Sequence, residues 1–285
     1  MSRTFYVNGE FVPESEAKVS VLDRGFLFAD AVYEVTTVLG GRLIDNAAHL
    51  ARLARSLGEL AMPAPASDDE LVAAQRRLVE LNGVEEGLVY LQVSRGVAER
   101  DFAYPTDPVP SLVMFTQAKD ISGSPAAKRG LRVVTVADLR WRRRDIKTVQ
   151  LLAPSMAKQA ALDAGVDDAW MVEDGHVTEG TSNNAWIVTD GRRIRTRQVG
   201  SEILSGITRA AVMRFAREAG YEVVEAPFTV EEARSAAEAF VTSASAFVMP
   251  VVEIDGAALG EGRPGPVATR LRELYIEAAR ERADL

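Results

Sequence analysis

The chain has 285 residues, a net charge of −8, 47% hydrophobic residues and 26% charged residues. This composition is typical of a globular protein, and the length allows two modest domains or one large one. The negative charge disfavours a nucleic-acid partner, because proteins that bind the phosphate backbone normally carry a basic excess. The lack of cysteine excludes disulfides, zinc–thiolate sites and thiol nucleophiles, and two histidines are too few for a multi-histidine metal centre.

The N-terminal segment MSRTFYVNGEFVPESEAKVS alternates polar and apolar residues and carries acids early. It therefore resembles neither a signal peptide nor a membrane anchor. We expect a cytoplasmic protein without a membrane partner.

The first 118 residues alternate strand and helix patterns. TFYVNGEFV predicts a hairpin that turns at an Asn-Gly pair, and VYEVTTVLGGRLI predicts a second hairpin around Gly-Gly. NAAHLARLARSLGEL and SDDELVAAQRRLVELNG predict helices, the second with a capping box of Ser67 and Glu70. LVYLQVSRG and SLVMFTQA predict buried strands.

A looser segment, KDISGSPAAKRG, predicts an interdomain linker at residues 119–130. Beyond it, LRVVTVADLRW predicts a strand and PSMAKQAALDAG a helix, while DAWMVEDGHV and NAWIVTDGRRI each turn at Asp-Gly. SGITRAAVMRFAREAG predicts a helix opened by Ser205, and a last helix starts at Pro266. We expect an α+β or mixed α/β fold with domains at 1–118 and 131–285.

The lysines are few, five against 28 arginines. Lysine can lose its proton and condense with a carbonyl, which arginine cannot, so Lys147 in RRRDIKTVQLL is a candidate for amine chemistry. The ordinary alternative is a surface lysine on a turn or edge strand. Lys158 fits the exposed face of a predicted helix, and the basic cluster LRWRRRDIK is typical of a solvated surface.

Three further features are weak signals when taken singly. Glu179 precedes Gly-Thr-Ser in HVTEGTSNN, where it faces a ligand or lies in a polar turn. The start of the helix in ILSGITRAA suits a phosphate, with Thr208 adding a hydroxyl, although simple capping by Ser205 is more common. His49 and Arg52 lie three residues apart in HLARL, where the arginine either clamps a phosphate or extends to solvent.

Together, these motifs resemble the class IV (fold-type IV) pyridoxal-phosphate aminotransferases, most closely the D-amino-acid aminotransferases. DRGFLFADAVYEV, HLARL, RDIKTVQLL, AKQAA, VTEGTSNNAWIV, LSGITR and FVTSASAFVMPVVEIDG follow the family's order and spacing over nearly the whole chain. The resemblance implies two α/β domains, a small N-terminal one and a larger one that binds pyridoxal 5′-phosphate, with the cofactor between them in a homodimer.

The resemblance also implies roles for individual residues. Lys147 matches the lysine that forms a Schiff base with the cofactor and shuttles the proton, and Glu179 matches the acid that pairs with the pyridine nitrogen. Arg52 matches the phosphate-binding arginine, and Leu204 the apolar side chain against the ring. The other matched positions are Gly206, Ile207, Thr208, Ser182, Ser243 and Ala244 for the cofactor, and Tyr33, Arg100 and Ser245 for the substrate carboxylate, with the arginine reaching the site from the neighbouring subunit.

Three positions depart from the family pattern. Phe102 replaces the histidine of the carboxylate trap, Ala244 replaces a phosphate-contacting threonine, and FADA replaces a more usual Gly-Asp-Gly. The first change bears on carboxylate recognition. The second removes a hydroxyl whose hydrogen bond contributes about 1 kcal/mol net.

We therefore expect a D-amino-acid transaminase that moves the amino group of a donor such as D-alanine to 2-oxoglutarate or pyruvate by ping-pong kinetics. The alternatives within the same fold are an (R)-amine transaminase, a branched-chain L-amino-acid aminotransferase and an aminodeoxychorismate lyase. A more distant alternative is a non-catalytic protein that binds an anionic metabolite, which would have no use for Lys147 together with Glu179.

Overall fold

The computed structural model describes residues 3–190 and 192–281, and it divides into two compact units. Unit 1 comprises Met1–Asp120, Ile146–Gln150 and Ala279–Leu285, and unit 2 comprises Ile121–Asp145 and Leu151–Ala278. The segment that carries Lys147 thus belongs to unit 1, although the sequence analysis assigned it to the C-terminal domain. The predicted boundary at 119–130 remains a prediction.

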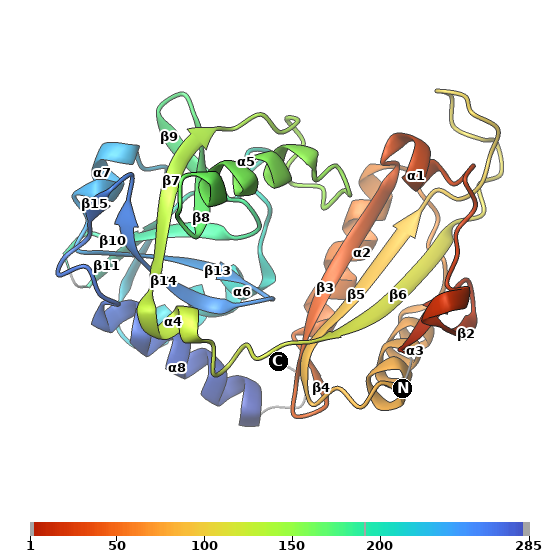
Figure 1. Ribbon diagram of the computed structural model, residues 1–285, viewed down its shortest axis with the longest axis horizontal. Coiled ribbons are helices and arrows are strands. Elements are labelled where there is room, and N and C mark those ends of the chain that lie inside the picture. Colours follow the sequence, from red (N-terminus) through yellow and green to blue (C-terminus); the bar gives the residue numbers. More distant parts are fainter. Residues whose placement is uncertain (1–2, 191, 282–285) are drawn as a thin grey trace. The chain divides into compact units, whose positions relative to one another are not determined.

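Unit 1 is built on a six-stranded sheet in the order β2-β1-β6-β5-β3-β4, with antiparallel neighbours throughout (Figure 1). Its strands are β1 (Thr4–Val7), β2 (Glu10–Pro13), β3 (Ala31–Leu39), β4 (Arg42–Ile44), β5 (Glu86–Ser94) and β6 (Ser111–Ala118). Asn8 and Gly9 both have positive φ, as a two-residue type I′ turn requires. The two predicted hairpins are confirmed.

Two long helices pack on this sheet, α2 (Asn46–Glu59) on β3 and α3 (Asp68–Leu81) on β1 and β6 (Figure 1). They bury leucines at helical spacing, and the predicted capping box of Ser67 and Glu70 is present at the start of α3. The short elements η1 (Glu14–Glu16) and α1 (Arg24–Phe28) were not predicted.

Unit 2 contains a nine-stranded mixed sheet in the order β12-β11-β10-β13-β14-β7-β8-β9, with β15 paired to β14. The β7–β8, β7–β14 and β11–β12 pairs are parallel. Its strands are β7 (Leu131–Ala137), β8 (Asp168–Glu173), β9 (His176–Gly180), β10 (Asn184–Val188), β11 (Arg193–Thr196), β12 (Glu222–Glu225), β13 (Glu238–Ser243), β14 (Phe247–Ile254) and β15 (Ala257–Ala258). The fold is mixed α/β, as predicted.

The helices of unit 2 flank this sheet, with α5 on β7 and β8 and α6 on β12 and β13. They are α4 (Pro125–Arg129), which lies in the predicted linker, α5 (Leu152–Asp163), α6 (Ile207–Glu218), α7 (Val230–Arg234) and α8 (Pro266–Glu281), whose last residues belong to unit 1. The prediction that Ser205 opens α6 is wrong, because the N-cap residue is Gly206. Gly191, part of a predicted Asp-Gly turn, lies outside the described residues.

Helices long and apolar enough to cross a bilayer are absent from residues 3–190 and 192–281.

Candidate active site

The backbone around Lys147 is fixed against the first residues of β3. The Tyr33 amide donates to the Lys147 carbonyl at 3.0 Å, and the Val149 amide donates to the Ala31 carbonyl at 3.1 Å. The Thr148 amide donates to the Ile146 carbonyl at 2.8 Å, which closes a three-residue turn centred on Lys147. Lys147 is therefore held in a tight turn beside β3 with its side chain half-buried; of the sequence-based alternative, a surface lysine on a turn or edge strand, the turn is present and the edge strand is not.

The half-buried side chain of Lys147 lies over an aromatic ring. Its Nζ is 4.2 Å from the centroid of Tyr33, whose ring stacks on Tyr90 with the centroids 5.5 Å apart. Among the described residues, no carboxylate forms an ion pair with Nζ. The structure thus brings together Lys147 and Tyr33, two of the predicted site residues.

Arg52 is bound to a buried carboxylate on β3. Its Nε and its NH2 group donate to the two oxygens of Glu34 at 2.8 and 2.7 Å, and Nδ1 of His49 lies 2.7 Å from Glu34. Burial opposes ionisation of Glu34, but Arg52 and His49 together lower its pKa to about 2. Glu34 fixes the plane of the guanidinium, so the sequence-based alternative of an arginine extending to solvent is wrong.

Arg100 is exposed on the loop that follows β5. Its guanidinium carbon lies 5.5 Å from the ring centroid of Phe28 and 5.8 Å from that of Phe102. Phe102 is itself 79% exposed. Arg95, by contrast, is buried and paired with Asp30, so of these two arginines only Arg100 is accessible to a ligand.

In unit 2, Glu179 lies near the end of β9 with both carboxylate oxygens bonded. Oε2 accepts a hydrogen bond of 2.5 Å from Arg140, and Oε1 accepts from Nδ2 of Asn184 at 2.8 Å and from the Leu204 amide at 3.0 Å. Arg140 also pairs with the fully buried Asp138 at 2.7 Å. Burial opposes the charge on Arg140, but Asp138 and Glu179 raise its pKa above the ordinary value. Glu179 is therefore held as a charged, oriented acceptor.

Arg140 and Asn184 were missed by the sequence analysis. The cluster LRWRRRDIK was interpreted as a solvated face, but only Arg142 and Arg143 fit this description. Arg144 is buried and bonds Glu173 with both terminal nitrogens. The available signal was Asp138, since an acid two residues before an arginine at the end of a predicted strand allows the two side chains to form an ion pair.

The N-terminus of α6 lies next to Glu179 through Leu204. Gly206 is the N-cap residue, and no side chain caps this end of the helix. A Cβ atom at position 206 would lie 2.0 Å from Oδ1 of Asn184, so only glycine fits there. Ile207 is half-buried and Thr208 is buried. The first amides of a helix and its dipole favour an anion.

The remaining predicted residues lie in two turns of unit 2. Ser182 is exposed in the turn between β9 and β10. Ser243 ends β13, and its Oγ lies 3.3 Å from Oγ of Ser245 across Ala244. These turns present hydroxyl and amide groups, and among the described residues no hydrogen bond joins the side chain of Ser182 to the two serines.

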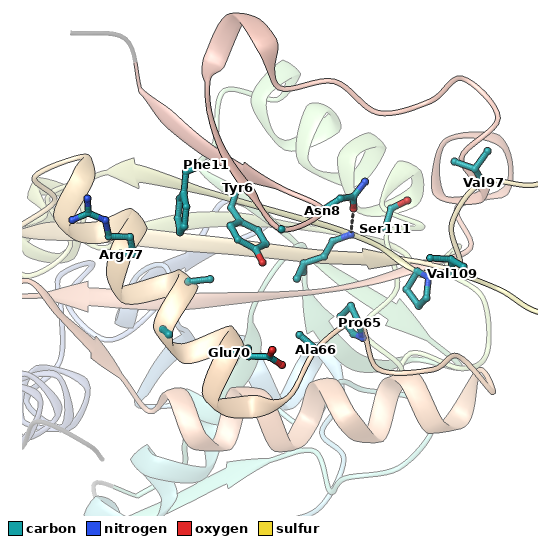
Figure 2. A pocket seen from close by; sticks show the side chains of 15 residues that line it. Tyr6, Asn8, Phe11, Pro65, Ala66, Glu70, Arg77, Val97, Val109 and Ser111 are labelled. Atoms are coloured by element: carbon teal, nitrogen blue, oxygen red, sulfur yellow. Dashed lines mark hydrogen bonds between the residues drawn. The ribbon is translucent and has the colours of Figure 1, made fainter.

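A pocket of about 900 Å³ lies elsewhere in unit 1, between the β1–β2 hairpin and α3 (Figure 2). Tyr6, Phe11, Glu70 and Val109 are among its lining residues. None of the predicted site residues lines it.

Comparison with known proteins relates the chain to aminotransferases. The class IV amino-transferase family model matches residues 31–254. The D-alanine aminotransferase of Staphylococcus aureus (strain MSSA476) is 39% identical over 277 residues, which cover 96% of this chain and 98% of the relative. The D-alanine aminotransferase of Bacillus licheniformis is 37% identical over 265 residues, 93% of each chain. The crystal structure of the T.th. branched-chain amino acid aminotransferase with pyridoxamine 5′-phosphate has a TM-score of 0.92 at 29% identity, covering 99% of this chain and 96% of that one.

The fold and these matches define a nitrogen-transferring enzyme. The chain belongs to the class IV aminotransferases, whose cofactor is pyridoxal 5′-phosphate.

The residues present fit this cofactor. Unit 1 offers the Lys147 amine over the Tyr33 ring and a guanidinium fixed by Glu34, while unit 2 offers a buried carboxylate and an uncapped helix N-terminus at a glycine. These groups match the carbonyl, the phosphate and the pyridine nitrogen of pyridoxal phosphate in chemical type.

Proposed function

We propose that the protein is a pyridoxal-phosphate-dependent D-amino-acid transaminase. It transfers the amino group of a D-amino acid such as D-alanine to a 2-oxo acid, 2-oxoglutarate or pyruvate. The observation that carries the substrate class is the near-complete alignment with relatives named D-alanine aminotransferase, at 39% and 37% identity.

In this proposal, Lys147 provides the working amine. When bound, pyridoxal phosphate supplies a carbonyl for condensation and a ring that accepts electrons from the substrate α-carbon. Nζ of Lys147 would hold the cofactor until the substrate amine displaces it, and would then act as a neutral base that carries the α-proton of the substrate to C4′ of the cofactor. The turn at residues 146–148 and the Tyr33 ring support this assignment, because they limit where Nζ can lie.

The acid partner of the ring nitrogen is Glu179. Arg140, Asn184 and the Leu204 amide keep its carboxylate ionised and oriented, so that it accepts a charged hydrogen bond from the pyridine N–H. Leu204 packs against the ring. The phosphate is assigned to the following groups: Arg52, Gly206, Ile207, Thr208, Ser243 and Ala244. Ser182 is assigned to the cofactor without a particular group.

Recognition of the substrate carboxylate is assigned to Tyr33, Ser245 and the partner subunit's Arg100. The exposure of Arg100 supports a role beyond its own unit. A homodimer and a cytoplasmic location are part of this proposal. Phe102 cannot donate the hydrogen bond of the family's histidine, so the carboxylate is held with fewer donors.

A donor comparison tests the proposal. The enzyme loaded with pyridoxal phosphate is assayed with 2-oxoglutarate and D-alanine, L-leucine or (R)-1-phenylethylamine in parallel. We expect kcat/KM for D-alanine to exceed the other two by at least about tenfold. A branched-chain aminotransferase is the second candidate, because the T.th. enzyme carries that name and shares the fold. Preference for L-leucine would select it, and preference for the amine would select an amine transaminase.

A further inference from the structure

Asn184, the first residue of β10, is at the centre of a closed ring of hydrogen bonds in unit 2. Its Nδ2 donates to Oε1 of Glu179 at 2.8 Å and to the Leu204 carbonyl at 2.9 Å. The Leu204 amide donates back to Oε1 of Glu179 at 3.0 Å. Both partners of Nδ2 are acceptors, which fixes the orientation of the amide group.

This ring connects two parts of the proposed cofactor site. Glu179 is the acid assigned to the pyridine nitrogen, and Leu204 lies two residues before Gly206, where α6 begins. Asn184 also packs on Gly206 so closely that a Cβ atom there would lie 2.0 Å from its Oδ1. Its side chain is buried, so water cannot readily replace these contacts.

The turn that leads to Asn184 is held from its other side. Asp168, at the start of β8, accepts from Oγ1 of Thr181 at 2.6 Å and from Nδ2 of Asn183 at 2.9 Å. Lys158 donates to the same carboxylate at 3.3 Å. The side chain of Asn183 thus anchors the turn through Asp168 and, among the described residues, has no hydrogen bond to Glu179 or Leu204, which makes it a matched control for Asn184.

We propose that Asn184 is a positioning residue that sets the Glu179 carboxylate and the N-terminus of α6 in one geometry, so that ring nitrogen and phosphate are bound together. This inference rests on the proposed function, because it assigns the acid and the helix to pyridoxal phosphate. It predicts that Asn184 acts through Glu179 and therefore that changes at the two positions are not additive.

The test is a double-mutant cycle on cofactor affinity. Apoenzymes of the wild type, Asn184→Ala, Glu179→Ala and the double variant are titrated with pyridoxal phosphate, and binding is followed by visible absorbance. We expect Asn184→Ala to raise the Kd about tenfold in the wild-type background, since it removes a hydrogen bond to a charged group. In the Glu179→Ala background the further rise should be less than about threefold. Asn183→Ala should lower the melting temperature but change Kd by less than about threefold, equally in both backgrounds.

The possible outcomes distinguish the positioning role of Asn184 from the proposed function. An equal, tenfold effect of Asn184→Ala in both backgrounds, or no effect in either, would overturn the positioning role while leaving the proposed function intact. A wild-type apoenzyme that binds no pyridoxal phosphate would overturn the proposed function and this inference with it. Should Asn184→Ala fail to fold by far-UV circular dichroism, Asn184→Leu, which is similar in size but has no amide group, replaces it in the same cycle, with the same non-additivity expected.

Discussion

Arg140 shows how one buried side chain controls another. It is held by Asp138, just after the end of β7, and it donates to Glu179. These two carboxylates therefore fix the position of its guanidinium. A guanidinium suits this place because it stays charged and can serve two carboxylates through different nitrogens. If Glu179 pairs with the ring nitrogen as proposed, the negative charge that it offers depends on Arg140.

Replacing Arg140 gives a graded prediction. Arg140→Gln removes the positive charge, so Glu179 should protonate more readily and kcat should fall about tenfold to a hundredfold, most steeply at low pH. Arg140→Lys keeps the positive charge but lacks the planar guanidinium that binds two carboxylates at once. Its kcat should therefore lie between those of the Gln variant and the wild type. Steady-state kinetics with D-alanine from pH 6 to pH 9 measure this. Equal activity of the Gln and Lys variants across that range would show that the charge on Arg140 does not matter.

One departure from the family pattern, alanine in place of glycine at position 29, has a consequence for stability. It ends α1 with a φ of 54°, in the left-handed region where glycine carries no penalty and alanine costs about 1 kcal/mol. Ala29→Gly should therefore raise the free energy of unfolding by about 0.5–1 kcal/mol. Ala31→Gly, at a fully buried strand position two residues later, should lower it instead. Urea unfolding of the two variants beside the wild type measures both, and a loss in each would contradict the strain at position 29.

At the scale of elements, β3 and α2 are joined by buried charge. Glu34 on β3 meets His49 and Arg52 on α2, and the three side chains are nearly inaccessible to water. Removing one partner of such a group is strongly destabilising, because it leaves an unpaired charge in the interior. This pairing fixes the register of α2 on the sheet and with it the direction of Arg52.

The same pairing predicts acid sensitivity. The pKa of Glu34 is about 2 in the folded protein, below its ordinary value of 4.5. The stabilisation is thus complete above pH 4.5 and is lost as the pH falls towards 2, by about 3 kcal/mol in all. Urea unfolding followed by far-UV circular dichroism from pH 6 to pH 3 tests this. Glu34→Gln should be less stable at pH 6 and should lose less stability on acidification. An equal loss in both proteins would assign the acid sensitivity to other groups.

The local sequence pattern predicted most helices and strands, because turn residues and helix caps influence only the few residues next to them in the chain. The Asn8–Gly9 hairpin and the Ser67 capping box depend only on neighbouring residues, and both are confirmed. The N-cap of α6 is Gly206 rather than Ser205, since glycine is required there by contact with Asn184, twenty-two residues earlier in the chain. Contacts of this kind leave no local pattern.

At the scale of the whole molecule, the candidate residues are distributed over both units, Lys147 and Arg52 in unit 1 and Glu179 in unit 2. Lys147 lies in a five-residue segment of unit 1, although the chain on both sides of it belongs to unit 2. The resemblance to class IV aminotransferases identified Lys147, Glu179 and Arg52 as candidates from motif order alone. It did not identify Arg140, Asn184 or Glu34, because those residues support the candidates through buried pairs formed by distant segments.

The central claim is that the amine at position 147 carries the cofactor, and reduction with borohydride tests it most directly. The holoenzyme is reduced, digested and mapped by mass spectrometry, with Lys147→Ala treated in parallel. We predict a phosphopyridoxyl group on the peptide that contains Lys147, none on that peptide in the variant, and loss of turnover in the variant. Stoichiometric label on Lys158 or another of the remaining lysines, with Lys147 unmodified, would contradict the account.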